Sequence, residues 1–297
     1  MHISYSDTTA WQRCPRYYLH RCVFRRVPVR ESTALRVGTA WHTAMESYWT
    51  DGGGKPAAAK ALQECAADID EVDCARLAAM LEHYAPPVER YEVRGIEQRL
   101  DMPIIDPDSG KRLRGVSFRG IADLVLWDKD RRELVIVDHK TTSSQVIGFG
   151  PFWQGLTINR QLTWYRQAVG AHCVIYDAAK KPNYKPSAED RKVAGGGDVL
   201  EAFRTRVSSI IAAEPEAWYQ WREIRLTDDE ICNAMRDLCA VVYQIRQAHQ
   251  HNRWPCAPGQ CVTRYGDCEY LDVCSGRARL DDDASFRDVG EGRYTEA

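Results

Sequence analysis

Residues 120–142, GIADLVLWDKDRRELVIVDHKTT, constrain the fold more than any other part of the sequence. Two runs rich in Val, Ile and Leu flank a short polar stretch, a pattern that predicts a β-hairpin. Asp123 lies in the first run, and Asp138 and Lys140 lie at the end of the second. Because Asp138 and Lys140 are two residues apart, an extended segment projects both side chains from one face. The hairpin could bring Asp123 opposite them.

Two carboxylates and an ammonium at the end of an apolar sheet would be costly to bury without a function. Hard oxygen ligands suit Mg²⁺ or Mn²⁺, so the segment predicts a divalent metal site at this end of the hairpin. An edge hairpin whose charges face water is the alternative that the segment alone leaves open.

The composition is typical of a soluble globular protein, with 44% hydrophobic and 28% charged residues in a chain of 297. The sequence contains no long apolar run and its first residues lack the pattern of a signal peptide, so we expect a cytoplasmic protein with no membrane partner. The net charge of −2 means that any DNA-binding basic surface must be local. One basic run lies near the N-terminus: Arg13, Arg16, Arg21, Arg25, Arg26 and Arg30.

Eleven cysteines are a high number for a cytoplasmic protein. Their odd number and the missing signal peptide argue against a disulfide framework. Cys261, Cys268 and Cys274 are spaced among turn residues near the C-terminus. Clustered cysteines in a cytoplasmic protein are ordinarily metal ligands. Cys256 is an alternative to Cys261 as a member of this cluster.

Coarse patterns predict the remaining elements. Thr227, followed three residues later by Glu230, predicts the start of a long helix through Gln247. The other expected elements are a helix over 4–27 interrupted at Cys14-Pro15, a helix over 35–46, a helix over 57–84, a strand over 93–104, a loop over 141–155, a helix over 158–169, a strand over 171–176, a loop over 180–197 and a helix over 199–211.

Asp123, a hairpin and then Asp138-His139-Lys140 resemble the D…(D/E)-x-K signature of the PD-(D/E)XK nuclease superfamily. The N-terminal motif Cys14-Pro15-Arg16-Tyr17-Tyr18 resembles the opening of RecB-family nucleases and their CRISPR-associated relatives. The resemblance spans residues 4–274 through five motifs in the family's order. It implies an α/β fold with a central mixed β-sheet flanked by helices, as in restriction endonucleases.

The resemblance also implies roles for individual residues. His42, which on its own would more often be a core histidine, would join Asp123, Asp138 and the backbone carbonyl of His139 in holding Mg²⁺ or Mn²⁺. Lys140 would act on the attacking water and on the charge that develops at the phosphate.

Gln161 and Tyr165, four residues apart on one helix face, match the family's Q-x-x-x-Y motif. The resemblance implies that both support catalysis and contact DNA. Glu97, within the strand expected over 93–104, is a candidate for the periphery of the site.

In the iron–sulfur members of this family, an N-terminal cysteine joins three C-terminal ones. The resemblance therefore implies that Cys14, Cys261, Cys268 and Cys274 bind a [4Fe–4S] cluster, with zinc as the alternative, and join the two ends of the chain. We expect residues 1–276 to form a single domain and residues 277–297 to form an acidic, disordered tail.

The expected activity is metal-dependent exonucleolytic hydrolysis of DNA in recombination, repair, CRISPR adaptation or phage DNA processing. A structure-specific endonuclease on the same fold and a catalytically inactive DNA-binding subunit are the alternatives. The sequence has no G-x-x-x-x-G-K-[ST] motif, so the chain would act alone or with a helicase or recombination partner.

Overall fold

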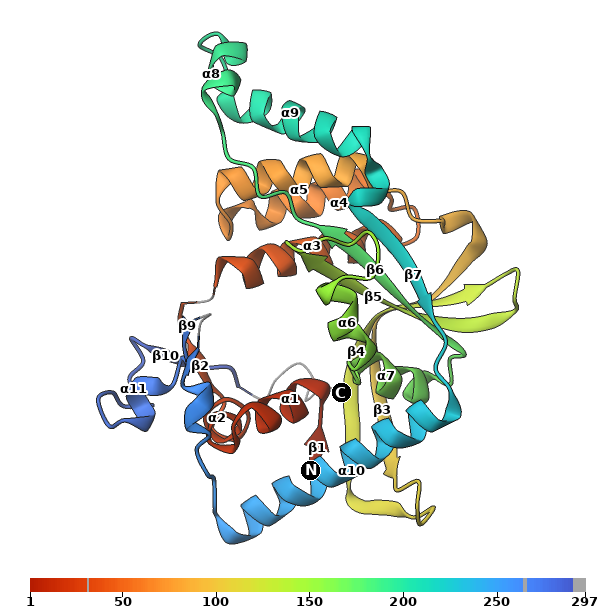
Figure 1. Ribbon diagram of the computed structural model, residues 1–297, viewed down its shortest axis with the longest axis vertical. Coiled ribbons are helices and arrows are strands. Elements are labelled where there is room, and N and C mark those ends of the chain that lie inside the picture. Colours follow the sequence, from red (N-terminus) through yellow and green to blue (C-terminus); the bar gives the residue numbers. More distant parts are fainter. Residues whose placement is uncertain (31, 264–265, 291–297) are drawn as a thin grey trace. The chain divides into compact units, whose positions relative to one another are not determined.

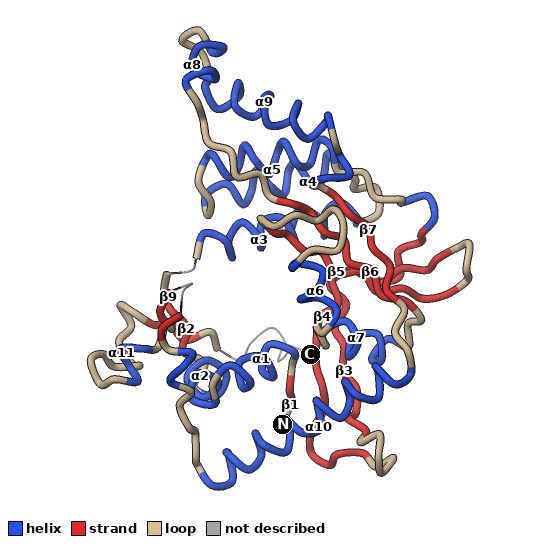
Figure 2. The backbone as a smooth tube through the Cα atoms, viewed as in Figure 1, coloured by secondary structure: helices blue, strands red, loops and turns tan. Residues whose placement is uncertain are grey.

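The computed structural model describes residues 1–30, 32–263 and 266–290, which group into two compact units (Figures 1 and 2). The first unit is built from Met1–Glu31, Arg99–Gly120 and Thr227–Ala297, and the second from Ser32–Gln98 and Ile121–Leu226. A single domain over residues 1–276 stays a prediction. Within the described ranges, no helix has the length and apolar character needed to cross a membrane.

The second unit contains a mixed sheet. Strand β4 (Arg112–Asp128), whose residues 121–128 belong to this unit, runs antiparallel to β5 (Glu133–Thr142). Strand β6 (Cys173–Lys180) runs parallel to β5, and β7 (Tyr219–Ile224) is antiparallel to β6. Strand β3 (Tyr91–Ile105) pairs with β4. The expected α/β fold with a mixed central sheet is therefore confirmed.

Helices flank the sheet of the second unit, and some of them pack more on other helices than on its strands (Figure 1). Helices α3 (Thr33–Trp49), α4 (Lys55–Glu64), α5 (Glu71–His83) and α9 (Val199–Ala213) share one apolar core that includes Trp41, Met80 and Phe203. Helix α7 (Gln161–Val169) contacts β5 and β6, and it follows the short helix α6 (Pro151–Thr157).

Alternation along the strands separates the two faces of this sheet. Val135 and Val137 of β5 join Cys173 and Ile175 of β6 in one buried apolar cluster. Tyr176, the next residue of β6, instead packs its ring on Trp153 of α6, with centroids 6.4 Å apart. Neighbouring strand positions therefore meet different helices.

Three expectations for this unit differ from the structure. The helix expected over 57–84 is divided, because a 3₁₀ turn (Cys65–Ala67) ends the first half and Asp70 caps α5 by accepting from the Asp73 N–H at 2.8 Å. The expected loop over 180–197 contains helix α8 (Ala188–Ala194), which begins at a capping box between Ser187 and Asp190. The end of the expected loop over 141–155 belongs to α6.

The first unit combines segments from both ends of the chain. Strand β1 (His2–Ile3) is parallel to β4, and β2 (Arg26–Pro28) is antiparallel to β10 (Phe286–Asp288). Helix α10 (Asp228–His251) has the capping box expected at Thr227. The remaining short elements are the 3₁₀ turn Pro258–Gln260, β8 (Val262–Thr263), β9 (Gly266–Asp267) and α11 (Leu271–Cys274).

The expected N-terminal helix is interrupted at the cysteine. Helix α1 (Tyr5–Arg13) ends at Cys14, whose φ of −169° and ψ of 123° are extended, and Pro15 opens the short helix α2 (Pro15–Tyr18). A π-helical turn (Leu19–Val23) follows. Proline is tolerated in a first helical turn, so the interruption falls immediately before it.

Part of the expected acidic tail is ordered by packing. Phe286, in strand β10, is 5% exposed, and its ring is stacked on Tyr270 with centroids 5.5 Å apart. The apolar contact and the pairing with β2 offset the polar composition around it. The last residues of the expected tail, 291–297, lie outside the described ranges.

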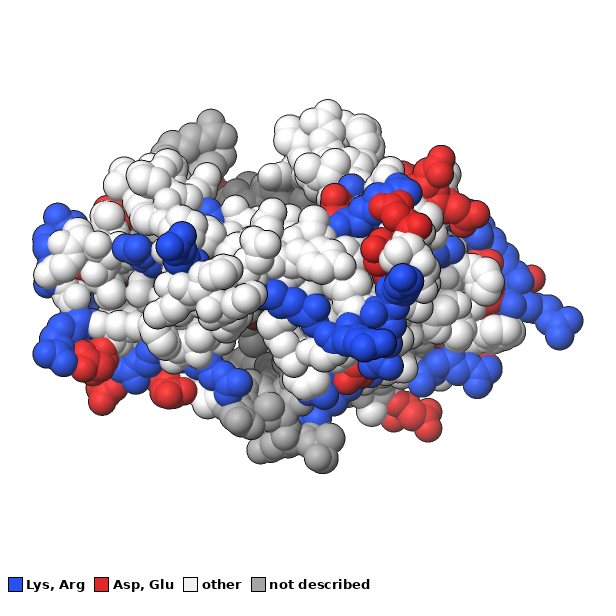
Figure 3. All heavy atoms as spheres, turned by 90° about the horizontal axis from the view of Figure 1, so that it is seen from below, with Lys and Arg blue, Asp and Glu red and all other residues white. Residues whose placement is uncertain are grey.

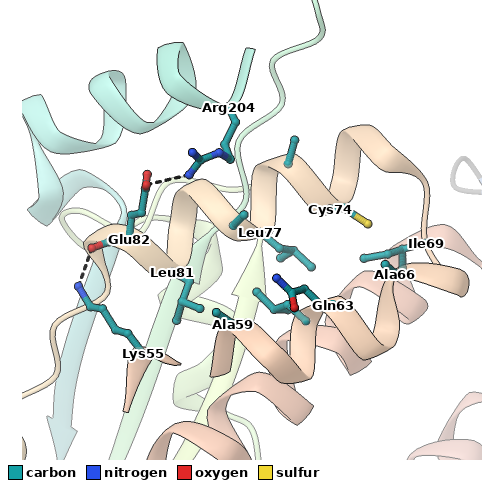
Figure 4. A pocket seen from close by; sticks show the side chains of 13 residues that line it. Lys55, Ala59, Gln63, Ala66, Ile69, Cys74, Leu77, Leu81, Glu82 and Arg204 are labelled. Atoms are coloured by element: carbon teal, nitrogen blue, oxygen red, sulfur yellow. Dashed lines mark hydrogen bonds and ion pairs between the residues drawn. The ribbon is translucent and has the colours of Figure 1, made fainter. Parts of the chain in front are cut away.

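A pocket with a volume of about 420 Å³ opens between α4 and α5 (Figure 4). Its walls are mainly Ala and Leu side chains, and Glu82 at one end accepts from Arg204 at 2.8 Å. No residue expected in a catalytic or metal site lines it.

The packing of α8 on α9 predicts a pH-dependent contribution to stability. The Asp190 carboxylate is 2% exposed and accepts from Nε of Arg206 at 2.7 Å. This hydrogen bond lowers the pKa of Asp190. Since the pKa of an unfolded Asp is about 4, the stabilisation is fully present above pH 4 and is lost as the pH falls through the folded pKa.

We therefore expect Asp190→Asn to lower the free energy of unfolding at pH 7 by about 2 kcal/mol. The loss should shrink at pH 3, and urea unfolding at both pH values measures it. Glu189→Gln, an exposed neighbour on the same helix, is the control. An Asp190→Asn variant as stable as the parent at pH 7 would show that the pair contributes nothing.

Candidate active site

Two carboxylates of the second unit meet where β4 and β5 stop pairing. The antiparallel register runs to Leu124 opposite Val137, one residue short of both Asp123 and Asp138. Beyond that point the Asp123 carboxylate accepts a hydrogen bond from the backbone N–H of His139 at 2.8 Å. This N–H is therefore bonded to a side chain and not to a carbonyl of the neighbouring strand. The predicted hairpin thus brings Asp123 to the end of β5.

The site places negative charge in a poorly hydrated position. The Asp123 side chain is 13% exposed and that of Asp138 is 2% exposed. Burial raises the pKa of Asp123 to about 6, and the neighbouring Asp138 charge adds to the increase. A cation near these oxygens would therefore be stabilised strongly.

Lys140 supplies one such cation. Its Nζ lies 2.7 Å from Oδ2 of Asp138, as expected for positions i and i+2 on one strand face. The same ammonium donates to Oε1 of Gln161 at 3.2 Å. Gln161 is the first residue of α7, and its own N–H donates to Oδ1 of Asn159 at 2.8 Å.

The other half of the Q-x-x-x-Y motif lies one turn further along α7. Tyr165 is 6% exposed. Its side chain is therefore part of the buried packing, and its support of the catalytic residues stays a prediction.

His42 reaches the carboxylates from helix α3. Its Nδ1 lies 3.4 Å from Oδ2 of Asp123, and its side chain is 35% exposed. Burial lowers the pKa of His42, and the charge of His139 lowers it further. The ring is therefore neutral at pH 7, which is the form that binds metals.

Glu97 lies in strand β3 with a φ of 45°, a left-handed conformation that is uncommon outside glycine. Its charge acts on the pKa of His42, which places the two residues near each other. Strained backbone of this kind is enriched at functional sites. Its place at the periphery of the site stays a prediction.

Sequence analysis missed two residues beneath the site. Nδ1 of His139 lies 2.7 Å from Oδ2 of Asp177 on the adjacent strand β6, and the Tyr84 hydroxyl donates to the same oxygen at 2.6 Å. The isolated charge of Asp177 in the otherwise apolar run from Cys173 to Ala179 was the signal in the sequence.

Five cysteines of the first unit also come together. None of the eleven cysteines of the chain is in a disulfide. One small pocket is lined by Cys14, Cys256, Cys261, Cys268 and Cys274. Sγ of Cys14 accepts from the Ala257 N–H at 3.3 Å, and the sulfurs of Cys256 and Cys261 are 3.9 Å apart. The structure thus places the alternative Cys256 beside the four predicted ligands.

Neither the residues around Asp123 and Asp138 nor the cysteine pocket has the geometry of a complete metal site. Across residues 1–30, 32–263 and 266–290, no set of three or more His, Cys, Asp or Glu side chains has the geometry to hold a metal ion. The predicted ligand sets stay predictions.

Several N-terminal arginines serve the first unit itself. Arg26 donates to the carbonyl of Leu280 at 3.0 Å, and Arg13 and Arg21 lie 3.5 and 3.6 Å from the Glu269 carboxylate. These contacts link the two ends of the chain. Figure 3 shows Lys and Arg side chains in several separate groups on one face, with Asp and Glu beside some of them.

An α/β sheet that ends in two carboxylates and a lysine is the arrangement that the D…(D/E)-x-K signature describes. The chain belongs to the PD-(D/E)XK nuclease superfamily, because residues 2–275 match the model of that family. This confirms the superfamily expected from the sequence and supports nuclease activity. Members of the superfamily typically use Mg²⁺ or Mn²⁺.

Two crystal structures are similar to this chain. One, described as "Putative exonuclease" from Eubacterium rectale, has 16% identity and a TM-score of 0.52, over 93% of this chain and 88% of that one. The other, of SSO0001, has 14% identity and a TM-score of 0.39, over 82% of this chain and 76% of that one. The first supports the fold, and the second is too dissimilar to add to it. A comparison with curated proteins finds no match.

Proposed function

We propose that this protein is a metal-dependent deoxyribonuclease that degrades DNA from its ends. The observation that carries the proposal is the meeting of Asp123, Asp138 and Lys140 where the pairing of β4 with β5 stops, in a chain of this superfamily. The similar structure from Eubacterium rectale, described as "Putative exonuclease", is the reason for proposing an exonuclease and not an endonuclease.

The donor set suits a hard divalent cation. Asp123 and Asp138 offer carboxylate oxygens, the His139 carbonyl offers a further oxygen, and His42 offers a neutral imidazole nitrogen. When bound there, Mg²⁺ or Mn²⁺ would offset charge on the phosphate and make a water more acidic. These four residues are the ones that would hold it.

Lys140 acts on the reacting phosphate. Its side chain is 27% exposed, so the ammonium can reach a bound substrate while Asp138 and Gln161 hold it in place. A fixed positive charge stabilises the negative charge that develops in the transition state. Gln161 and Tyr165 would position the DNA strand on α7.

The substrate that this site fits is the phosphodiester backbone. Contacts to phosphates carry no sequence information, so binding should be salt-sensitive and independent of sequence. Processing of DNA ends in recombination or repair, alone or with a helicase or recombination partner, is the role that such an activity serves.

We further propose that the cysteine pocket binds a [4Fe–4S] cluster. Four or five soft sulfur donors from the two ends of the chain suit iron–sulfur clusters and zinc alike. Tetrahedral zinc with Zn–S bonds of about 2.3 Å would place its sulfur ligands roughly 3.8 Å apart. The sulfurs of Cys256 and Cys261 are 3.9 Å apart, so their separation is also compatible with zinc. Metal analysis separates the two.

The first prediction of this proposal concerns catalysis. We expect Asp138→Asn and Lys140→Met each to reduce DNA cleavage about a hundredfold or more, because both act mainly in the transition state. DNA binding in Ca²⁺ should change little. Both variants should stay folded, with a lower melting temperature in Lys140→Met because the buried Asp138 carboxylate loses its ion pair. Lys129→Met, in the turn of the same hairpin, is the matched control. Cleavage at the parent rate in either site variant would overturn the assignment.

The second prediction concerns the substrate. End-labelled linear DNA should be degraded in Mg²⁺ or Mn²⁺, whereas covalently closed circles should be spared because they offer no end. Gel assays of both substrates at equal enzyme concentration measure the preference. Equal cutting of the two would favour the endonuclease alternative, and binding without cleavage of either would favour an inactive DNA-binding subunit.

The third prediction concerns the cysteine pocket. Cys14→Ser should lower metal content and melting temperature together, because ligation across the two chain ends couples metal binding to folding. Iron, sulfide and zinc analysis of anaerobically purified protein measures it, and Cys65→Ser, outside the pocket, is the control. Comparing Cys256→Ser with Cys261→Ser identifies the ligand. Unchanged metal content in Cys14→Ser would exclude Cys14 from the site.

A further inference from the structure

A buried chain of hydrogen bonds runs beneath the strand that carries Asp138 and Lys140. The Tyr84 hydroxyl donates to Oδ2 of Asp177 at 2.6 Å, and Nδ1 of His139 lies 2.7 Å from the same oxygen. Tyr84, Asp177 and His139 are 1%, 2% and 3% exposed. Water therefore does not compete for these contacts.

The three residues come from three different elements that lie at or beside the candidate active site. His139 is in β5 and Asp177 is its direct register partner in the parallel strand β6. Tyr84 caps the C-terminus of α5. Its ring packs edge-on against Trp41 and Tyr48 of α3, with centroids 5.7 and 5.2 Å away. Helix α3 is the element that carries His42.

Stability alone gives no reason for this chain of contacts. Burying an ionised carboxylate and its partner costs desolvation, and apolar side chains of the same volume are often at least as stabilising. The neighbouring positions of the same strand faces, such as Val137 and Ile175, are apolar. A buried polar network in their place fixes geometry, because its hydrogen bonds are directional.

The geometry that it fixes is that of the carboxylates. The backbone N–H of His139 donates to Asp123 at 2.8 Å, so the position of this one residue determines where the Asp123 carboxylate lies. The side chain of His139 can move little while Asp177 holds its ring. Tyr84 in turn links Asp177 to the helix that presents His42, which lies 3.4 Å from Asp123.

We propose that Asp177 and Tyr84 are positioning residues of the nuclease site, which hold His139, Asp123 and His42 in the arrangement that binds a divalent cation. This inference rests on the proposed function, because it assumes that these residues are the cation's ligands. Hydrogen-bond partners one step removed from a ligand commonly change metal affinity or activity about 10- to 100-fold.

The test compares Tyr84→Phe and Asp177→Asn with the parent protein. Phe keeps the ring that packs on Trp41 and Tyr48 and removes only the hydroxyl, and Asn keeps the size of the Asp side chain. Mn²⁺ affinity is measured directly by electron paramagnetic resonance in the absence of DNA. We expect the Mn²⁺ Kd to rise about tenfold in Tyr84→Phe and up to about 100-fold in Asp177→Asn.

Kinetics provide a second readout. Cleavage should recover in part at high Mn²⁺, while KM for DNA should stay close to that of the parent because neither residue contacts the substrate. Asp190→Asn is the matched control: Asp190 is 2% exposed and hydrogen-bonded like Asp177, but its partner is Arg206 of α9. It should lower the melting temperature without changing Mn²⁺ affinity.

The outcomes separate the possibilities. If Tyr84→Phe and Asp177→Asn lower the melting temperature but bind Mn²⁺ as the parent does, the network is structural and the inference is wrong. If Asp177→Asn does not fold, Tyr84→Phe decides by the same criterion. A parent protein that binds Mn²⁺ but cuts no DNA overturns the proposed function. The Mn²⁺ Kd values of the variants then still decide whether Asp177 and Tyr84 are positioning residues. A parent that binds no Mn²⁺ overturns both.

Discussion

Buried charge at the ends of β5 and β6 is the constraint on which the second unit depends. Asp138, His139 and Asp177 are each 3% exposed or less, and each has an oppositely charged or hydrogen-bonding partner within 2.7 Å. An unpartnered charge at this depth costs far more than a lost apolar contact. The partners therefore restrict how β6 can be placed against β5 and how α5 can be placed against both.

The period of two along a strand lets one short segment serve two purposes. Asp138 and Lys140 share one face, where Gln161 of α7 meets the ammonium. His139, between them, faces the opposite way and bonds to Asp177. The proposed catalytic groups and the groups proposed to hold the strand are thus adjacent in sequence without competing for the same space.

The candidate active site and the cysteine pocket are assembled by different means. Asp123, Asp138 and Lys140 lie within one hairpin, so local pairing is sufficient to bring them close. The cysteines come from segments at the two ends of the chain. Tertiary contacts hold these segments in the first unit, among them the hydrogen bond of Arg26 to Leu280 and the stacking of Phe286 on Tyr270. For this reason the hairpin motif was specific about its members, whereas spacing left Cys256 and Cys261 as alternatives.

The sequence by itself determined the hairpin, because apolar patterning and residues close together in the chain specify it. It also indicated the superfamily and, through that resemblance, the mixed α/β fold. It also predicted the start of α10, where the capping box is a local signal. Helix α8 was missed although Ser187 and Asp190 form a local capping box at its start. Strand β10 was missed because its polar segment carries no such signal and packs on the distant Tyr270. The tertiary structure alone decided that Tyr84 and Asp177 lie beneath His139. No sequence spacing relates a helix cap to two strands, and only folding brings three distant polar groups into a space from which water is excluded.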